Sequence, residues 1–353
     1  MGSKTNKSIL ILSGLTLLLN VLTAQIISPF NNLPVYDSSK NYSFIVSGHF
    51  HGASTNSSTF PASSLLANID SLNSLKPVFL MSLGDMFLDV NDTYINHYKY
   101  CLFDKLKMPL FNSVGNHDLA GNVYEKKFGK TYFSFVHNSE LFIVLNTEMN
   151  DGSIKDEQLK LFTFSIDTAL KSEIKNVFIF THRPIWAERI EKYSKLFSDN
   201  TRTALGNNNF IEDIEPLLKK VSKNKNVYWL SGSMGGMAPA SFFFDKDEKT
   251  NVTFMQTSIR DLPRDAILQV NINNGIATLK GISITGQKLT PVEDYNLVYW
   301  NKNMAPEQAF NFRLVPYLAK QMLLHHFFWF GFFFFLLITL TITFIKKRWK
   351  RKK

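Results

Sequence analysis

The sequence has almost no cysteine. Cys101 is the single cysteine among 353 residues, so no intramolecular disulfide can form and the fold must depend on its hydrophobic core. A chain of this length can bury a sizeable core, either as one large domain or as two smaller ones. Internal repeats are also absent, and low complexity is confined to one phenylalanine-rich run near the C-terminus. These absences exclude a small disulfide-held scaffold and a repeat architecture.

Excess charge is missing from the body of the chain. The net charge of +10 would by itself favour a nucleic acid or an anionic surface as partner. Seven of the positive charges lie in residues 346–353, and Lys4 and Lys7 carry two more, so the rest of the chain carries only +1. The basic character therefore belongs to the ends, and we expect no nucleic-acid partner.

Both ends carry long apolar runs. Residues 327–345 contain no charged side chain and are enough to cross a hydrocarbon core of about 30 Å as a helix. The basic residues 346–353 should then form a cytoplasmic tail by the positive-inside rule. Residues 1–30 combine early lysines with an apolar run, which predicts a signal peptide or a signal-anchor helix. We therefore expect a membrane-anchored protein whose intervening domain is extracytoplasmic, whether periplasmic, extracellular or lumenal.

Apolar strands alternate with helical stretches through the middle of the chain. Buried strands are predicted at 42–47, 77–83, 108–114, 176–181 and 227–230, with helices at 64–75, 92–107, 155–171 and 211–221. A hairpin is predicted over 131–146, an irregular lid over 187–209, and a β-rich second layer over 252–259, 266–272 and 277–284. This order predicts an α/β domain whose site lies at the carboxyl ends of the strands.

Possible metal ligands follow four of these strands. The strands lead into Gly48-His49-Phe50-His51-Gly52, Gly84-Asp85, Gly115-Asn116-His117-Asp118 and His182-Arg183. Alternate residues of an extended segment point the same way, so His49 and His51 suit a common ion. The two oxygens of the Asp85 carboxylate could bridge two cations. Each motif alone is also compatible with an ordinary polar loop or a turn aspartate, but their shared position at strand ends favours one site.

In this order the motifs resemble those of the calcineurin-like metallophosphoesterase superfamily, over roughly residues 42–285. The resemblance implies a two-sheet α/β sandwich flanked by helices, with a metal centre that promotes in-line attack on phosphorus. The cofactor it implies is a divalent transition metal, Zn, Mn or Fe, as one or two ions. The implied ligands are His49, His51, Asp85, Asn116 and His182, with Asp85 between the ions.

The resemblance also implies catalytic and substrate-binding roles. His117 would act as an acid or hydrogen-bond donor beside the leaving-group oxygen. Asp118 would hold His117 in a carboxylate–histidine pair. Arg183 would bind a phosphate oxygen, which is an inference from its charge and position alone.

Two features of the resembled pattern are missing. Its first carboxylate is replaced by His49, and its terminal Gly-His-x-His is replaced by Gly232-Ser233-Met234-Gly235. No histidine lies between His182 and His325, so none can substitute from nearby. The acidic residues that could fold inward instead are Asp245, Asp247 and Asp261.

Two functions fit these observations. The first is a membrane-anchored phosphoesterase with its domain at 31–290 and a linker at 291–326, acting on a phosphorylated small molecule, lipid or glycan near the bilayer. The second is a catalytically impaired metallophosphoesterase-fold module that binds an anionic envelope ligand. Retention of Gly115-Asn116-His117-Asp118 favours the enzyme, and loss of Gly-His-x-His favours the binding module.

Overall fold

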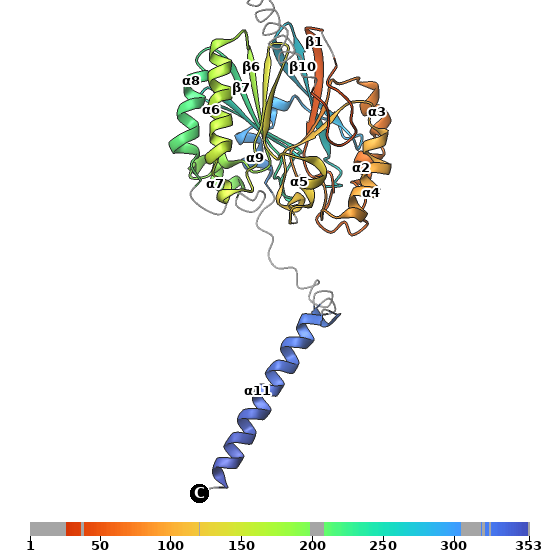
Figure 1. The fold of residues 1–353 in the computed structure, drawn as a ribbon, viewed down its shortest axis with the longest axis vertical. Coiled ribbons are helices and arrows are strands. Elements are labelled where there is room, and N and C mark those ends of the chain that lie inside the picture. The colour runs from red at the N-terminus through yellow and green to blue at the C-terminus, as the bar shows by residue number, and fades with distance from the viewer. Residues whose placement is uncertain are drawn as a thin grey trace, which may run out of the picture. The chain divides into compact units, whose positions relative to one another are not determined.

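The computed structural model describes residues 26–36, 39–119, 121–197, 208–304, 319, 322–324 and 326–351. The chain divides into two compact units, one ending at Met304 and the other beginning at Ala305. The first unit contains two β-sheets with helices on their outer sides (Figure 1). The predicted two-sheet α/β sandwich flanked by helices is therefore confirmed. Most of the predicted signal peptide or anchor, residues 1–25, lies outside the described residues.

Parallel strands make up most of both sheets. The first sheet has the order β11-β10-β1-β2-β3 and consists of β1 Asn41–Ser47, β2 Leu80–Ser82, β3 Leu110–Asn112, β10 Ala266–Asn273 and β11 Ile276–Ser283. The second has the order β4-β5-β6-β7-β9-β8 and consists of β4 Phe133–His137, β5 Glu140–Val144, β6 Asn176–Thr181, β7 Asn226–Ser231, β8 Phe242–Asp247 and β9 Val252–Thr257. Strands β1, β2 and β3 run parallel to one another, as do β5, β6, β7 and β9.

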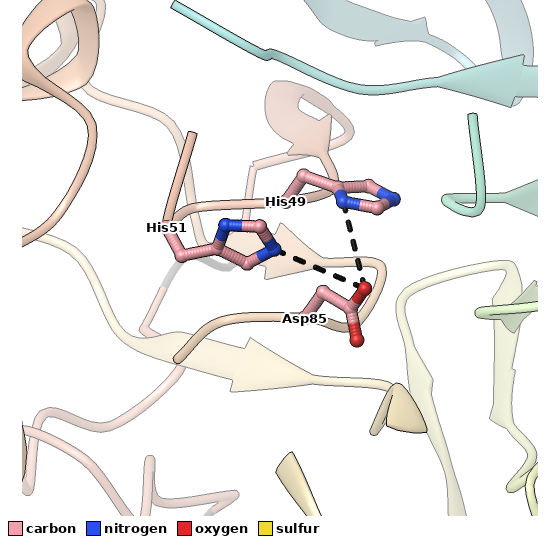
Figure 2. A group of neighbouring side chains, drawn as sticks. All are labelled: His49, His51 and Asp85. Atoms are coloured by element: carbon pink, nitrogen blue, oxygen red, sulfur yellow. Dashed lines mark ion pairs between the residues drawn. The ribbon is translucent and has the colours of Figure 1, made fainter. Parts of the chain in front are cut away.

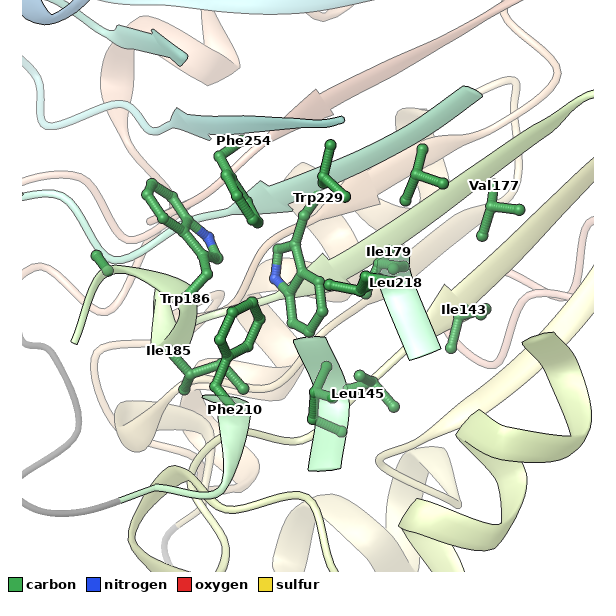
Figure 3. Close-up of a cluster of buried hydrophobic side chains, with 14 of the residues drawn as sticks. Ile143, Leu145, Val177, Ile179, Ile185, Trp186, Phe210, Leu218, Trp229 and Phe254 are labelled. Carbon is green, nitrogen blue, oxygen red and sulfur yellow. The ribbon is translucent and has the colours of Figure 1, made fainter. Parts of the chain in front are cut away.

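The strands form because their apolar side chains alternate between two buried layers. In β6, Val177 and Ile179 pack toward the outer helices, whereas Phe178 and Phe180 pack between the sheets. Figure 3 shows the outer layer, where Val177 and Ile179 lie with Leu218 of the adjacent helix. Each large apolar side chain buried in this way contributes about 1.5–3 kcal/mol. A strand buried on both faces is a continuous apolar run, which explains why the sequence pattern located it.

Helices cover the outer faces of the sheets (Figure 1). Those packed on the first sheet are α2 Ser63–Leu66, α3 Ile69–Ser74, α4 Asp92–Cys101 and α5 Val123–Phe128, and those packed on the second are α6 Asp156–Lys171, α7 Glu191–Phe197 and α8 Glu215–Val221. Single helical turns are η1 Phe103–Lys105, η2 Asn116–Asp118, η3 Asn150–Gly152, η4 Ile185–Ala187, η5 Phe210–Ile214 and η6 Val292–Asp294, and α9 Leu297–Asn303 ends the unit. Part of the predicted lid, residues 198–207, lies outside the described residues.

The last strands divide between the two sheets instead of forming the predicted second layer. Strand β9 joins the second sheet beside β7, whereas β10 pairs with β1 in the first sheet. The prediction is wrong because the chain crosses from one sheet to the other between Thr257 and Ala266. Strand β8 adds to the predicted set, since its charged second half, Asp245–Asp247, hides the apolar alternation that identifies a strand.

The folded unit extends beyond the predicted bounds of 31–290. Ser28 Oγ donates to the carbonyl oxygen of Leu110 at 2.7 Å, and Phe30 packs in the core of the first sheet. At the other end, Trp300 of α9 is fully buried and its Nε1 donates to the Phe242 carbonyl oxygen at 2.9 Å. Residues 291–304, predicted as linker, therefore belong to the fold.

The second unit contains helix α11, His326–Lys350. It includes the whole apolar run 327–345 and the start of the basic tail. Among the described residues it is the one helix long and apolar enough to cross a membrane. The helix itself confirms the sequence prediction, while its insertion in a bilayer stays a prediction.

Candidate metal centre

Loops at the carboxyl ends of β1, β2, β3 and β6 bring the candidate ligands together. His49 and His51 follow β1, Asp85 follows β2, and His182 follows β6. The first two loops are joined by a hydrogen bond from the His49 backbone N–H to the Gly84 carbonyl oxygen at 2.9 Å. The cluster therefore takes residues from both sheets.

Asp85 is the centre of this cluster. Its Oδ2 lies 3.5 Å from His49 Nδ1, 3.9 Å from His51 Nε2 and 3.4 Å from His182 Nε2. Its Oδ1 accepts a hydrogen bond from the backbone N–H of His117 at 3.1 Å. Figure 2 shows the rings of His49 and His51 directed at the carboxylate. One carboxylate oxygen thus faces three imidazole nitrogens.

The cluster is buried, and its backbone is locally strained. The side chains of the three histidines and Asp85 are at most 4% exposed. His49 has φ +56° and Asp85 has φ +52°, which is a region that residues other than glycine seldom adopt. Gly115 gives the carboxylate room, because a Cβ there would lie 2.2 Å from Asp85 Oδ1. Strain of this kind persists where the surrounding structure enforces it, often at functional sites.

His182 presents an electron pair to the carboxylate. Its Nδ1 lies 2.8 Å from the Leu83 carbonyl oxygen, which can only accept, so Nδ1 carries the proton. In the neutral ring Nε2 is then unprotonated, and it is buried without a hydrogen-bond partner. Two electron-rich atoms, His182 Nε2 and Asp85 Oδ2, therefore lie 3.4 Å apart. A cation relieves this repulsion, and histidines oriented by a carbonyl group are frequent metal ligands.

The remaining ligands are in the protonation states that metals require. Both ring nitrogens of His51 are buried without a partner. Burial lowers the pKa of His51 and holds that of His49 well below its usual value. Burial raises the pKa of Asp85, but His182 and the other imidazoles outweigh it and leave this pKa well below the usual value. Neutral imidazoles and an ionised carboxylate are the metal-binding forms.

The donor set fits a divalent transition metal. His49, His51 and Asp85 offer ligand atoms that all lie within 4.8 Å of one another. Imidazole nitrogens with a carboxylate oxygen suit Zn, Mn or Fe rather than the oxygen-only sites of Ca and Mg. The orphaned nitrogens of His51 and His182 are the observation that a bound ion would account for.

Asn116 and His117 belong to η2, directly after β3. The ring centroid of His117 lies 5.4 Å from that of His51, so this imidazole borders the cluster. His117 Nδ1 donates to the Leu88 carbonyl oxygen at 2.8 Å, which leaves Nε2 as the nitrogen available to a ligand. Asn116, predicted as a metal ligand, opens the turn beside His117 and is half-buried.

Asp118 does not form the predicted pair with the His117 ring. Its Oδ1 accepts from the Phe87 backbone N–H at 3.1 Å, and its Oδ2 accepts from the Gly115 backbone N–H at 3.0 Å and from Asn112 Nδ2 at 3.1 Å. These partners bind the loop after β2 to the loop after β3. The carboxylate therefore positions the cluster's backbone, because its oxygens are occupied by these donors while the Nδ1 proton of His117 goes to the Leu88 carbonyl oxygen.

Arg183 is also engaged differently from the prediction. Its Nε donates to Glu148 Oε1 at 2.7 Å, and its Nη2 pairs with Oε2 of the same carboxylate. The side chains of Arg183 and Glu148 are 12% and 4% exposed. The guanidinium expected to bind phosphate is thus neutralised by a buried glutamate that the sequence pattern did not single out.

The three spare aspartates do not replace the missing histidines. Asp245 and Asp247 both pair with Lys192, at 2.8 and 3.1 Å. Asp261 Oδ1 accepts from the backbone N–H and the hydroxyl of Ser64 at 3.0 and 2.8 Å. Each of these carboxylates is therefore paired with Lys192 or hydrogen-bonded to Ser64.

Arg260 stands beside the position of the missing histidines. It follows β9, and its Nε donates to the Met234 carbonyl oxygen at 2.8 Å. Its Nη2 lies 3.4 Å from His49 Nε2. The sequence reasoning missed Arg260. The signal that could have identified it is its position just after an apolar strand, like the other site residues.

The chain matches no protein-family model and no curated protein sequence. Among solved structures it is similar to GAP50, described as the anchor in the inner membrane complex of Plasmodium, with a TM-score of 0.51 and 12% identity over 77% of this chain and 97% of that chain. Purple acid phosphatase PPD1 from yellow lupin has a TM-score of 0.46 and 10% identity, over 80% of this chain and 58% of that chain. A predicted phosphoesterase from Streptococcus pneumoniae has a TM-score of 0.31 and 11% identity, over 70% of this chain and 92% of that chain. The likeness to GAP50 shows a shared fold.

Proposed function

We propose that this chain is a metal-dependent phosphoric ester hydrolase of the metallophosphoesterase type, acting on a phosphate monoester or diester. The observation that carries the proposal is the convergence of three buried imidazoles on Asp85 Oδ2, with both ring nitrogens of His51 and Nε2 of His182 left without hydrogen-bond partners. A carboxylate surrounded in this way is costly to maintain unless it serves a cation. The retained Gly115-Asn116-His117-Asp118 run supports phosphoester chemistry in particular.

The contacts of each residue support a particular role in this proposed reaction. Asp85, His51 and His182 would hold the metal, with His49 and Asn116 beside them. A divalent transition metal bound there supplies Lewis acidity and positive charge to a phosphoryl group. His117 Nε2, left available by the bond from Nδ1 to Leu88, would donate a proton or hydrogen bond to the leaving-group oxygen.

We also propose where the enzyme works. Helix α11 would anchor the chain in a lipid bilayer, with the basic tail cytoplasmic and the folded unit extracytoplasmic. The substrate would then be a phosphorylated small molecule, lipid or glycan at the membrane surface. The near-neutral charge of the folded unit supports this choice over nucleic acid.

The test combines metal analysis with turnover. Purified full-length chain in detergent would be analysed for Zn, Mn and Fe, and assayed on p-nitrophenyl phosphate and bis-p-nitrophenyl phosphate. His117→Ala should lower turnover by about 10²–10⁴-fold, the usual contribution of a general acid, without changing metal content. His97→Ala is the matched control, since His97 stacks on Phe60 and bonds Thr59.

The proposal requires both a bound metal and turnover that depends on His117. Protein without metal, or turnover equal in wild type and His117→Ala, would contradict it. A chain that binds an anionic ligand without hydrolysing either ester would instead favour the binding-module alternative.

A further inference from the structure

Arg260 contacts both positions at which the chain departs from the pattern it resembles. Its Nε donates to the carbonyl oxygen of Met234, within the run that replaces Gly-His-x-His. Its Nη2 lies 3.4 Å from Nε2 of His49, which replaces the first carboxylate. Arg264 contacts the same run of residues, since its Nη2 donates to the Gly235 carbonyl oxygen at 3.0 Å. The region without ligands is therefore built from arginine side chains and backbone carbonyls.

Among the residues that the structure describes, no carboxylate pairs with the charge of Arg260. The side-chain hydrogen bonds of its guanidinium are those to Met234 and His49. Asp265 accepts from the backbone N–H of Arg260 at 2.9 Å and not from its side chain. The Nη1 group of this half-buried residue makes no hydrogen bond to the described residues. A guanidinium with donors to spare matches the geometry of a phosphate oxygen.

Arg260 also determines which nitrogen of His49 carries the proton. A guanidinium and a backbone N–H can only donate, so His49 Nε2 accepts from Arg260 and from the Met234 N–H. The neutral ring then carries its proton on Nδ1, the atom that faces Asp85 Oδ2 at 3.5 Å. A protonated nitrogen cannot bind a metal. His49 Nδ1 therefore directs a proton and not a lone pair at Asp85, without forming a hydrogen bond to it, whereas His182 Nε2 directs a lone pair at the same oxygen.

We propose that the guanidinium of Arg260 is the second positive charge of this centre, so that the chain binds one divalent cation through Asp85, His51 and His182. A phosphate oxyanion is then held by that cation together with Arg260 Nη1. This inference rests on the proposed metal-dependent function and names the charge that takes the place of a second ion. It makes Arg260 a substrate-binding residue, in the role that the sequence assigned to Arg183.

The experiment measures binding and not turnover. Full-length protein in detergent would be loaded with Mn²⁺, its metal content measured, and its electron paramagnetic resonance spectrum recorded. Inorganic phosphate would then be titrated by calorimetry into wild type and the variants Arg260→Met and Arg260→Lys. Arg189→Met is the matched control, because Arg189 pairs with Glu212 at the surface.

We expect one manganese ion per chain, with the spectrum of an isolated ion, in wild type and in every variant. Losing a charged hydrogen-bond donor should weaken phosphate binding about 10- to 100-fold in Arg260→Met, less in Arg260→Lys, and not in Arg189→Met. Two spin-coupled ions, or equal phosphate affinity in wild type and Arg260→Met, would overturn the inference while leaving the hydrolase proposal in place. Absence of metal would overturn both. One ion and Arg260-dependent phosphate binding without ester hydrolysis would support the inference alone.

Discussion

Asp118 accepts hydrogen bonds from three donors at a fully buried position. Two of these donors are backbone N–H groups, of Phe87 and Gly115, on the loops that carry Asp85 and His117. An ionised carboxylate suits such a position because it only accepts. The side chain therefore acts on the site through the backbone.

Replacing Asp118 by Asn should destabilise the fold. One carboxylate oxygen becomes an amide that must face a donor, so we expect a loss of about 2–4 kcal/mol in the free energy of unfolding. Urea unfolding of Asp118→Asn measures it, with Asp104→Asn as control. Asp104 makes an exposed pair with Lys99, and its loss should cost less than about 1 kcal/mol. Unchanged stability in Asp118→Asn with lost turnover would instead restore the predicted catalytic pair.

Glu188 is a buried carboxyl group with a hydrogen-bond partner on only one of its two oxygens. Its Oε2 accepts from Asn208 Nδ2, whereas its Oε1 has no partner. Burial raises the pKa of Glu188 to about 7, against the opposing effects of the Asn208 hydrogen bonds and of Arg183 and Arg189. The folded protein then holds this proton more tightly than the unfolded chain does, so stability should fall as pH rises from about 4.5 to about 7.

Glu188→Gln removes this proton dependence because the amide is neutral throughout. The variant should match wild type near pH 5 and exceed it at pH 8 by about 1 kcal/mol, a value reduced for partial solvent screening. Urea unfolding at the two pH values measures the difference. Glu212→Gln should show no such gain, because Glu212 is ionised in a surface pair with Arg189. An equal dependence of unfolding free energy on pH in wild type and Glu188→Gln would contradict the raised pKa of Glu188.

At the scale of elements, the end of β7 is locked against the loop after β2. A Cβ on Gly232 would lie 2.1 Å from the Leu83 carbonyl oxygen and 2.5 Å from Leu83 Cβ. The same Leu83 carbonyl oxygen accepts the proton of His182 Nδ1 at 2.8 Å. Close packing of two loops thus holds a candidate ligand in its tautomer.

Gly232→Ala should therefore damage both stability and metal binding. The backbone must move to admit the methyl group, and we expect a cost of about 2–4 kcal/mol together with weaker metal retention. Gly236→Ala is the control in the same loop, since a Cβ there meets no atom within 4 Å. Thermal unfolding and metal analysis of both variants provide the comparison, and similar behaviour of the two would contradict the close packing of Gly232.

At the scale of the whole molecule, helix α11 should decide whether the chain associates with membranes. Chains of residues 26–353 and 26–304 would be synthesised cell-free in the presence of liposomes. The longer chain should float with the vesicles after alkaline washing, because burying about 20 apolar residues in hydrocarbon is strongly favourable. The shorter chain should remain in solution, and flotation of both would assign membrane binding to the folded unit instead.

The apolar patterns of the sequence predicted most of the architecture. Some strand pairings became visible only in the folded chain. The β4–β5 hairpin and the strands β1, β6 and β7 lie where the sequence places them, since buried strands are recognisable as short apolar runs. The sharing of β9 and β10 between different sheets was not predictable. A strand's pattern states that it is buried but not which neighbour it pairs with.

The sequence by itself determined where the candidate ligands cluster and which helix could cross a membrane. The ends of parallel strands in one sheet lie at the same edge, which places His49, His51 and Asp85 together, and the length and composition of α11 are sufficient for a span. Only the tertiary structure decided the partners of these side chains. Arg183 meets Glu148 across 35 residues, and Arg260 meets His49 across 211. Such contacts depend on how distant loops pack, and they decide which charges remain available for a phosphate.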